Sequence, residues 1–208
     1  MHLRRLTRKV TTQVAFSLLA LAAIPAIPVL AQDKPAGPPA MGSAEMDAVM
    51  KTMSPGPQHK LLAQRVGDWT YTNKMWMAPG QPPIESSGTM HGEMILGGRY
   101  LEMSVHGQMM GMAFEGRSTE GYDNLAKQYV GTWVDNFGTG IMTGPSVCDE
   151  AGKKCTWTAD MIDPMSGKKM TTRQVTTLTD ADHFTMEMYN PDPSGKEMKS
   201  MEIHAKRK

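Results

Sequence analysis

The feature that most constrains the fold is a series of short segments, rich in Thr, Val, Tyr, Trp and Met, that begins at Trp69 and continues almost to the end of the chain. Brief turn sequences such as "APGQPP", "LGG", "DNLAK" and "NPDPSGK" separate the segments. Because each connection is short, successive strands must pair in antiparallel fashion. We predict strands over residues 69–77, 84–95, 99–108, 114–122, 128–135, 140–148, 155–162, 169–179, 183–189 and 196–206.

Short antiparallel strands with no helix between them are typical of a barrel or a sandwich. A closed up-and-down barrel is favoured because closure leaves no long strand edge exposed to solvent. The predicted fold class is therefore all-β, with an antiparallel up-and-down barrel of about ten strands.

A short helical segment is predicted before the first strand. "SAEMDAVMKTM" has Ser43 as a possible N-cap and an apolar stripe at helical spacing, formed by Met46, Val49, Met50 and Met53. "PQHKLLAQRVG" gives a second helical stretch, with Pro57 at its start and Gly67 at its end. We expect residues 43–208 to form a single domain.

Residues 1–31 have the organisation of a secretory signal peptide. "MHLRRLTRKV" is basic, and "VAFSLLALAAIPAIPVL" is apolar but too short and too interrupted by proline for a membrane span of about 20 residues. Val29 and Ala31 place small residues before a cleavage site at Gln32. We expect a periplasmic or secreted protein with no stable membrane anchor after cleavage.

The alternative to cleavage is an N-terminal anchor helix, which Pro25 and Pro28 argue against because proline breaks helices. Residues 32–42, "QDKPAGPPAMG", are rich in Pro and Gly and have nothing to bury. We predict that they form a disordered linker.

The charge balance bears on possible partners. Without residues 1–31 the chain keeps 18 Lys and Arg against 21 Asp and Glu, a formal charge of −3. This balance provides no basic surface for nucleic acid, so we expect no nucleic-acid partner.

Cys148 and Cys155 lie in "VCDEAGKKCTW", which predicts a tight hairpin with Ala151 and Gly152 at its tip. A two-residue loop places the two cysteines directly opposite each other, within disulfide reach. In an oxidising compartment we expect them to be bonded, with two free thiols as the alternative. The spacing and the lack of paired His residues argue against a zinc site.

Gly67-Asp68-Trp69, at the entry to the first strand, resembles the opening motif of lipocalin-like barrels. The resemblance implies that Trp69 plugs one end of the barrel and is covered by a basic residue from the last strand. Arg207 is the residue placed to stack on Trp69 through a cation–π contact.

A wider resemblance covers nearly all of residues 45–208. The segments "GDW", "MWMAPGQPP", "LGGRYL", "GYDN" and "DPMSGK" are similar to those of an uncharacterised bacterial family, a domain of unknown function. This resemblance implies a single secreted, lipocalin-like domain and brings no activity, substrate or catalytic residue. The cysteine pair departs from the family's pattern, which favours a local staple over a functional centre.

Methionine is unusually common, with 21 residues in the chain. Because the side chains of a strand alternate between its faces, several methionines two positions apart share a face. We predict that they line a barrel cavity that binds a small apolar or amphipathic ligand, since Met adapts to irregular space. The candidate wall residues are Trp69, Tyr71, Met75, Met77, Tyr100, Met103 and Trp133.

Three other interpretations remain open. A structural or interaction module with a filled core explains the same composition. A Cu(I) site made of Met thioethers is a weaker alternative, with Met109, Met110 and Met112 as its ligands. An enzyme that uses Asp135, Glu120 or His106 as acid or base is the weakest, because no catalytic motif is present. We expect no cofactor.

Overall fold

The computed structural model describes residues 42–163 and 166–208. The signal peptide and almost the entire linker predicted from the sequence lie outside the described residues. None of the helices within the described part of the chain is both long enough and apolar enough to cross a membrane.

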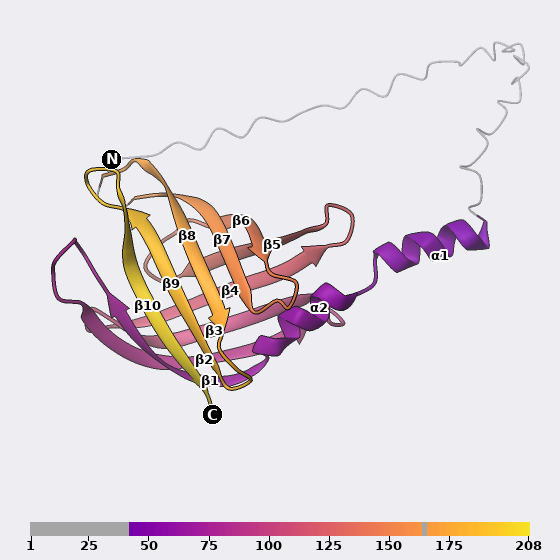
Figure 1. The fold of residues 1–208 in the computed structure, drawn as a ribbon, viewed down its shortest axis with the longest axis horizontal. Coiled ribbons are helices and arrows are strands. Elements are labelled where there is room, and N and C mark those ends of the chain that lie inside the picture. Colours follow the sequence, from indigo (N-terminus) through magenta and orange to yellow (C-terminus); the bar gives the residue numbers. More distant parts are fainter. Residues whose placement is uncertain (1–41, 164–165) are drawn as a thin grey trace, which may run out of the picture. The chain divides into compact units, whose positions relative to one another are not determined.

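The described residues form a closed barrel of ten strands (Figure 1). Every neighbouring pair is antiparallel, and β1 pairs with both β2 and β10, which closes the sheet. The strands are β1 Gly67–Met75, β2 Ile84–Ile95, β3 Tyr100–Met109, β4 Met112–Asp123, β5 Gln128–Asp135, β6 Met142–Cys148, β7 Lys154–Ile162, β8 Lys169–Leu178, β9 His183–Pro191 and β10 Glu197–Arg207. The predicted all-β, up-and-down barrel is therefore confirmed.

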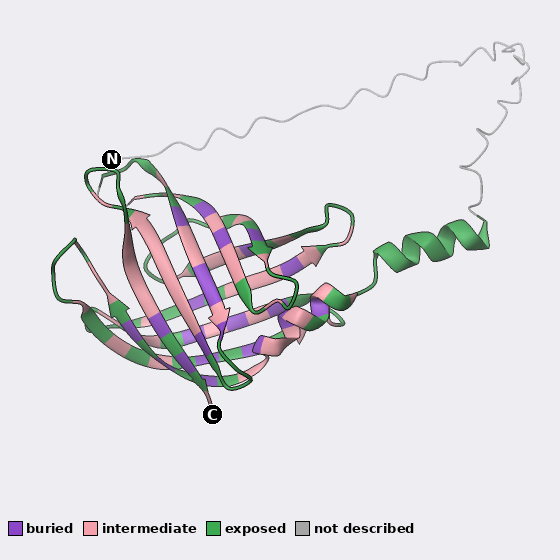
Figure 2. Cartoon of the chain, in the orientation of Figure 1, coloured by how far each residue is buried: buried purple, intermediate pink, exposed green. Residues whose placement is uncertain are grey.

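The alternation of buried and exposed residues fixes which side of each strand faces the interior (Figure 2). In β1, Trp69, Tyr71 and Asn73 are buried, whereas Thr70 and Thr72 between them are exposed. The face that carries Trp69 is thus the inner face, as the more polar character of the other face predicts.

The same alternation corrects the prediction for β3. Leu101, Met103 and Val105 are buried, but Tyr100 is 40% exposed. A Cβ at Gly121, the residue opposite Tyr100, would lie 2.6 Å from the Tyr100 ring. Because opposed residues share a face and Glu120 points inward, Tyr100 covers Gly121 on the outer face and is not a wall residue.

Two helices and one 3₁₀ turn precede the barrel: α1 Ser43–Thr52, α2 Pro57–Leu62 and η1 Ala63–Arg65. The N-cap of α1 is Gly42 rather than Ser43, and the Glu45 carboxylate accepts a 3.0 Å hydrogen bond from the Gly42 amide. The apolar stripe of α1 is exposed along its whole length (Figure 2).

The segment from Thr52 to Gln64 is held by the hairpin turns at one end of the barrel. Arg99, in the β2–β3 turn, donates to the Met53 carbonyl at 3.0 Å, and Asn124, in the β4–β5 turn, donates to the Thr52 and Ser54 carbonyls. The Gln64 side chain donates to the Ala151 carbonyl of the β6–β7 turn at 3.2 Å.

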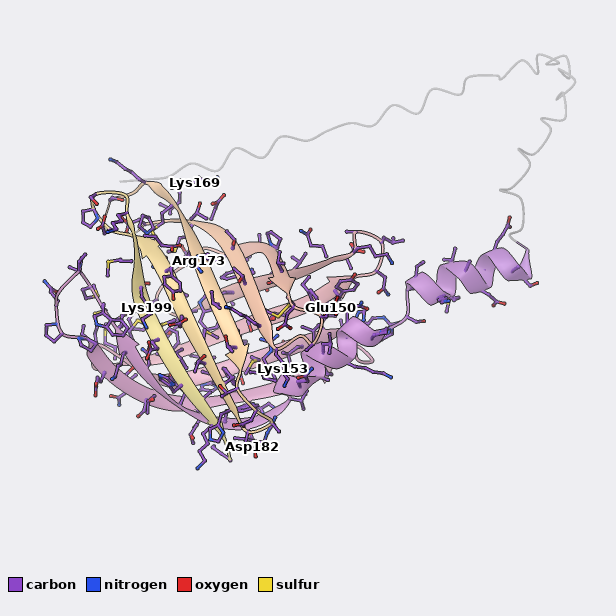
Figure 3. The ribbon with its side chains drawn as sticks, in the orientation of Figure 1. Glu150, Lys153, Lys169, Arg173, Asp182 and Lys199 are labelled. Carbon is purple, nitrogen blue, oxygen red and sulfur yellow. A yellow bond between two sulfur atoms is a disulfide. The ribbon has the colours of Figure 1, made fainter. Side chains whose placement is uncertain are left out.

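These contacts place α2 and η1 across one end of the barrel (Figure 1). In Figure 3, Glu150, Lys153 and Asp182 mark the turns at this closed end, while Lys169 marks the opposite end. The turns that follow β1, β3, β5, β7 and β9 surround that opposite end, which we call the mouth.

A disulfide joins Cys148 to Cys155, with an S–S distance of 2.01 Å, as the sequence predicts (Figure 3). The two residues are directly opposed partners in β6 and β7. Their connection is longer than the predicted two-residue loop, because Asp149 and Lys154 still share a backbone hydrogen bond and the turn begins only after them.

Candidate functional site

The barrel encloses a cavity of about 900 Å³ that reaches from the closed end to the mouth. Methionine dominates its wall. Among the described residues, twelve methionines line it: Met75, Met77, Met90, Met103, Met109, Met142, Met161, Met170, Met186, Met188, Met198 and Met201. A flexible thioether adapts to ligands of irregular shape, so this wall suits an apolar guest.

Aromatic rings lie over glycines on the inner face of the barrel. The Tyr71 ring lies so close to Gly88 and Gly107 that a Cβ on either glycine would come within 2.7 Å of its atoms. A Cβ at Gly116 would likewise lie 2.5 Å from the Trp133 ring. The rings can therefore lie along the wall instead of crossing the interior, which leaves space for a cavity.

The closed end of the cavity is a packed aromatic plug. Trp69 is 0% exposed and its ring lies edge-on to Phe184, with the ring centroids 4.9 Å apart. The Arg207 guanidinium carbon lies 4.0 Å from the centroid of the Trp69 ring, which is the contact expected from the sequence. Leu62 of α2 belongs to the same buried cluster.

A buried ion pair joins the plug to the barrel wall. Arg65, at the end of η1, donates two hydrogen bonds of 2.7 and 2.5 Å to the two carboxylate oxygens of Glu120 in β4. Burial acts to lower the pKa of Arg65, but the charge and hydrogen bonds of Glu120 outweigh it and raise that pKa. Both residues line the cavity, and each satisfies the other.

Neutral polar residues interrupt the apolar wall in two places. Asn73 donates to the Ser86 hydroxyl at 3.2 Å, and Asn190 donates to the Ser200 hydroxyl at 3.1 Å. All four residues line the cavity. The side-chain oxygen of each asparagine is buried and has no hydrogen-bond partner among the described residues.

The mouth is lined by residues of three loops. Trp76 and Met77 follow β1, Lys168 precedes β8, and Asp192 and Pro193 follow β9. Met77 is 53% exposed, and the Lys199 ammonium lies 5.6 Å from the Trp76 ring centroid. The mouth thus combines apolar surface with charges of both signs.

The sequence comparison identifies the family. A family model described as "Protein of unknown function (DUF1579)" matches residues 54–207. The chain belongs to this family. No curated protein matches the chain.

Comparison with solved structures finds a neighbour with a similar fold. The crystal structure of Rv2717c from M. tuberculosis has a TM-score of 0.54 and 11% sequence identity, over 74% of this chain and 99% of that chain. At that identity the likeness shows a shared barrel fold and nothing further. A redesigned β-barrel has a TM-score of 0.36 and 15% identity, covering 71% of this chain and 95% of its own.

Five of the seven candidate wall residues line the cavity: Tyr71, Met75, Met77, Met103 and Trp133. Trp69 points inward but lies within the plug, where no surface remains for a ligand. Tyr100 lies on the outer face, as described above. The members that line the cavity span its length, from Tyr71 next to the plug to Met77 at the mouth.

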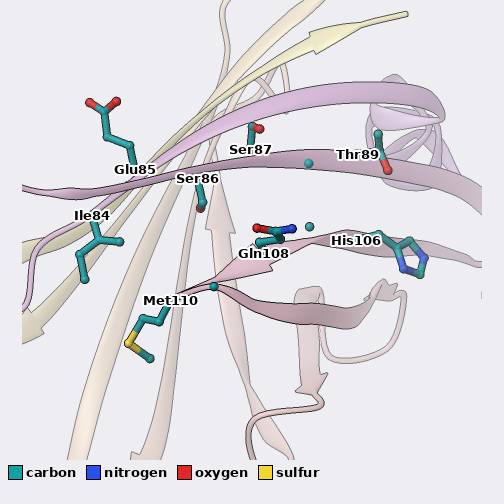
Figure 4. A pocket seen from close by; sticks show the side chains of 11 residues that line it. Ile84, Glu85, Ser86, Ser87, Thr89, His106, Gln108 and Met110 are labelled. Carbon is teal, nitrogen blue, oxygen red and sulfur yellow. The ribbon is translucent and has the colours of Figure 1, made fainter.

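The three methionines considered for copper do not line one pocket. Met109 lines the cavity, whereas Met110 lines a separate hollow on the outside of the wall (Figure 4). Met112 is 53% exposed. Among residues 42–163 and 166–208, no group of three or more His, Cys, Asp and Glu side chains is arranged to hold a metal ion.

The three residues considered for acid–base chemistry are also separated. Glu120 is bound to Arg65, and Asp135 accepts a 2.7 Å hydrogen bond from the Trp133 indole as well as bonds from the Phe137 and Gly138 amides. His106 lines the outer hollow and not the cavity. Asp135 therefore serves to hold the Trp133 ring and the following turn.

Sequence reasoning missed Arg65, Asn73 and Asn190 as part of the site. Arg65 lies in the segment "LLAQRVGDW", and the only available signal was a charged residue two positions before the Gly67-Asp68-Trp69 motif. Asn73 shares the parity of Trp69 and Tyr71, so a polar residue on the predicted inner face was the signal for its role.

Proposed function

We propose that this protein is exported and binds a small apolar or amphipathic molecule inside the barrel. The observation that carries the proposal is the cavity of about 900 Å³, lined mainly by methionine and aromatic side chains. Cavities of roughly 300–1,000 Å³ with an apolar wall and a few polar groups are typical of small-molecule sites.

The closed end and the mouth support the same conclusion. The plug of Trp69, Phe184 and Arg207 gives the cavity a floor. The mouth is bounded by hairpin turns, which are the parts of a barrel most able to move aside for a ligand. A ligand that enters here meets thioethers and aromatic rings together, from Trp76 and Met77 at the mouth to Phe184 near the floor.

Two features support export. The N-terminal sequence has the basic, apolar and small-residue regions of a signal peptide. The disulfide between Cys148 and Cys155 is of the kind that persists in an oxidising compartment.

Native mass spectrometry tests the proposal. The protein is produced with its own N-terminal segment, purified from the periplasm without added ligand, and measured intact. We expect cleavage before Gln32 and an additional organic mass of a few hundred daltons that is lost on denaturation. A mass increase that matches copper instead would contradict the proposal and support the Cu(I) alternative.

If the mass spectrum shows the polypeptide alone, the purified protein is titrated with N-phenyl-1-naphthylamine. The fluorescence of this apolar dye rises when it binds. Binding of the dye supports a hollow barrel, and its absence would support the filled-core alternative. Ser118→Trp, which fills the cavity from β4, should abolish binding. Arg117→Trp, on the outer face of the same strand, is the matched control and should bind as the wild type does.

A further inference from the structure

Asn73 is the most deeply buried polar residue of the cavity wall with an unsatisfied atom. The residue is 7% exposed and lines the cavity from β1. Its amide nitrogen donates to the Ser86 hydroxyl, but its Oδ1 has no partner among the described residues. A buried acceptor without a donor is destabilising, so such a group is usually met by a ligand, a water or a second side chain.

The other polar groups of the inner wall differ from Asn73. Arg65 and Glu120 satisfy each other through two hydrogen bonds, so neither needs a ligand. Asn190 also has an unpartnered oxygen, but it lies at the mouth end of β9 and is less buried. Asn73 alone among these groups combines an unsatisfied atom with a position between the floor and the mouth.

The wall beside Asn73 is open to the outside. Strands β2 and β3 pair from Ile95 and Tyr100 as far as Gly88 and Gly107, and beyond that point they separate. A hollow of about 630 Å³ lies between the separated ends (Figure 4). We call it the slot.

The slot and the cavity share two lining residues, Ser86 and Gln108. Ser86 is the direct partner of Asn73 in the ladder between β1 and β2. Asn73 and Ser86 are therefore a neutral polar pair at the place where the apolar cavity approaches the slot. No Lys or Arg is among the described residues that line the slot.

We propose that Asn73 determines the ligand class: it accepts a hydrogen bond from the uncharged, donating head group of an amphipathic molecule, such as the hydroxyl of a long-chain alcohol. The inference rests on the proposed function and adds the chemistry of the head group. An anionic head finds no Lys or Arg among the described residues that line the slot. A cationic head finds the slot's carboxylate, Glu85, already within 3.9 Å of the Lys74 ammonium.

The surroundings of Asn73 suit the rest of such a molecule. Its cross-strand partner in β10 is Ile203, and the next inward pair towards the mouth is Met75 and Met201. An alkyl chain that runs from Asn73 along this face meets apolar side chains. A buried acceptor within an apolar wall discriminates strongly between a donor and a non-donor, because the wrong ligand leaves the acceptor unpaired.

The test uses two isomers, 1-decanol and 1-methoxynonane, which have the same atoms but differ in the ability to donate a hydrogen bond. Their affinities are measured by displacement of N-phenyl-1-naphthylamine. We expect the wild type to bind the alcohol about tenfold more tightly than the ether. Asn73→Leu should bind the two isomers equally, because it removes the acceptor that distinguishes them.

Thr72→Val serves as the control. It changes the exposed neighbour of Asn73 in β1 and should leave the preference intact. Equal binding of the isomers by the wild type would overturn the inference, as would loss of the preference in Thr72→Val.

The outcomes separate the two proposals. If neither the dye nor either isomer binds, the proposed function fails and the inference falls with it. If the dye binds but Asn73→Leu keeps the preference, only the inference fails. If Asn73→Leu does not fold, NMR of the wild type replaces it as the test. The side-chain amide resonances of Asn73 should then shift when 1-decanol is added and should not shift with 1-methoxynonane.

Discussion

At the scale of single residues, Gly67 shows why the Gly-x-Trp motif has its form. The φ angle of Gly67 is 118°, in a region that residues with a side chain rarely adopt. A Cβ at this position would also lie 2.6 Å from the Arg207 guanidinium. That guanidinium must stay there because it stacks on Trp69 and donates to the Gln64 carbonyl at 3.1 Å.

Gly67→Ala should therefore destabilise the protein by about 2–4 kcal/mol, from backbone strain and displacement of Arg207. Urea unfolding followed by Trp fluorescence measures the loss. Gly140→Ala is the matched control, because a Cβ at Gly140 meets nothing within 4 Å. If both variants unfold at the same urea concentration, the close approach of Arg207 is not what restricts this position.

His59 gives the protein a pH-dependent contact at the start of α2. The residue is 5% exposed, and its Nδ1 accepts a 2.9 Å hydrogen bond from the Gly56 amide, so the folded state requires that nitrogen to be unprotonated. Burial lowers the pKa of His59 from 6.5 and outweighs the hydrogen bond to the Tyr122 backbone, which acts to raise that pKa; the positive charge of Arg99 adds to the lowering.

The sign of the effect follows from linkage. Well above pH 6.5 His59 is neutral in both states. As the pH falls through 6.5 the unfolded chain takes up the proton first, so stability falls as the pH drops towards the folded-state pKa. We expect the urea midpoint to fall between pH 7.5 and 5.5 by less in His59→Asn than in the wild type. An equal fall of the midpoint in the two proteins would assign the pH dependence to groups other than His59.

At the scale of elements, the strands were predictable because turn chemistry marks their ends. β2 and β5 begin and end at the predicted residues, next to "LGG" and "DNLAK". Leu96, Gly97 and Gly98 all have positive φ angles, which is the backbone that the Gly pair indicated. The inner face of β1 was also predictable, because its two faces differ in polarity.

Other elements could not be read in this way. Tyr100 and Leu101 are both apolar neighbours at the start of β3, so the pattern cannot choose which one faces inward. The separation of β2 from β3 beyond Gly88 leaves no mark on the alternation, because both strands continue regularly on their other sides. The slot, and with it the role of Asn73, follows only from strand pairing.

The disulfide is a staple of one hairpin. It joins residues only 7 positions apart, so it constrains a short loop in the unfolded chain. We expect the Cys148→Ser/Cys155→Ser variant to lose about 2 kcal/mol of stability and to keep its affinity for N-phenyl-1-naphthylamine. Reductant should lower the urea midpoint of the wild type and not that of the variant. A loss of dye binding in the variant would assign the pair a role in the site, since Cys155 lines the cavity.

At the scale of the whole molecule, one ion pair connects the N-terminal plug to the barrel. Arg65 and Glu120 are 55 positions apart, and their pairing depends on how α2 and η1 cross the end of the barrel. Sequence alone gives no means to pair them, because residues 65 and 120 belong to unrelated local patterns. Their side chains are 8% and 22% exposed, so the pair is shielded from solvent on most sides.

Arg65→Met should therefore cost about 3–5 kcal/mol, because it leaves the Glu120 carboxylate largely buried without its partner. The double variant Arg65→Met/Glu120→Leu should recover most of this loss, since it removes both charges from the floor of the cavity. Urea unfolding of the single and double variants completes a double-mutant cycle, and the coupling energy measures how firmly the plug is held.

Arg117→Met is the matched control for this cycle. It breaks the ion pair with Glu102, where the Arg117 side chain is 57% exposed, and should cost under about 1 kcal/mol. If Arg65→Met costs no more than Arg117→Met, the plug is held by Trp69 and Arg207 rather than by the ion pair. In that case packing fixes the floor of the cavity. The Arg65 and Glu120 side chains, which line the cavity, could then separate to bind a ligand without loss of stability.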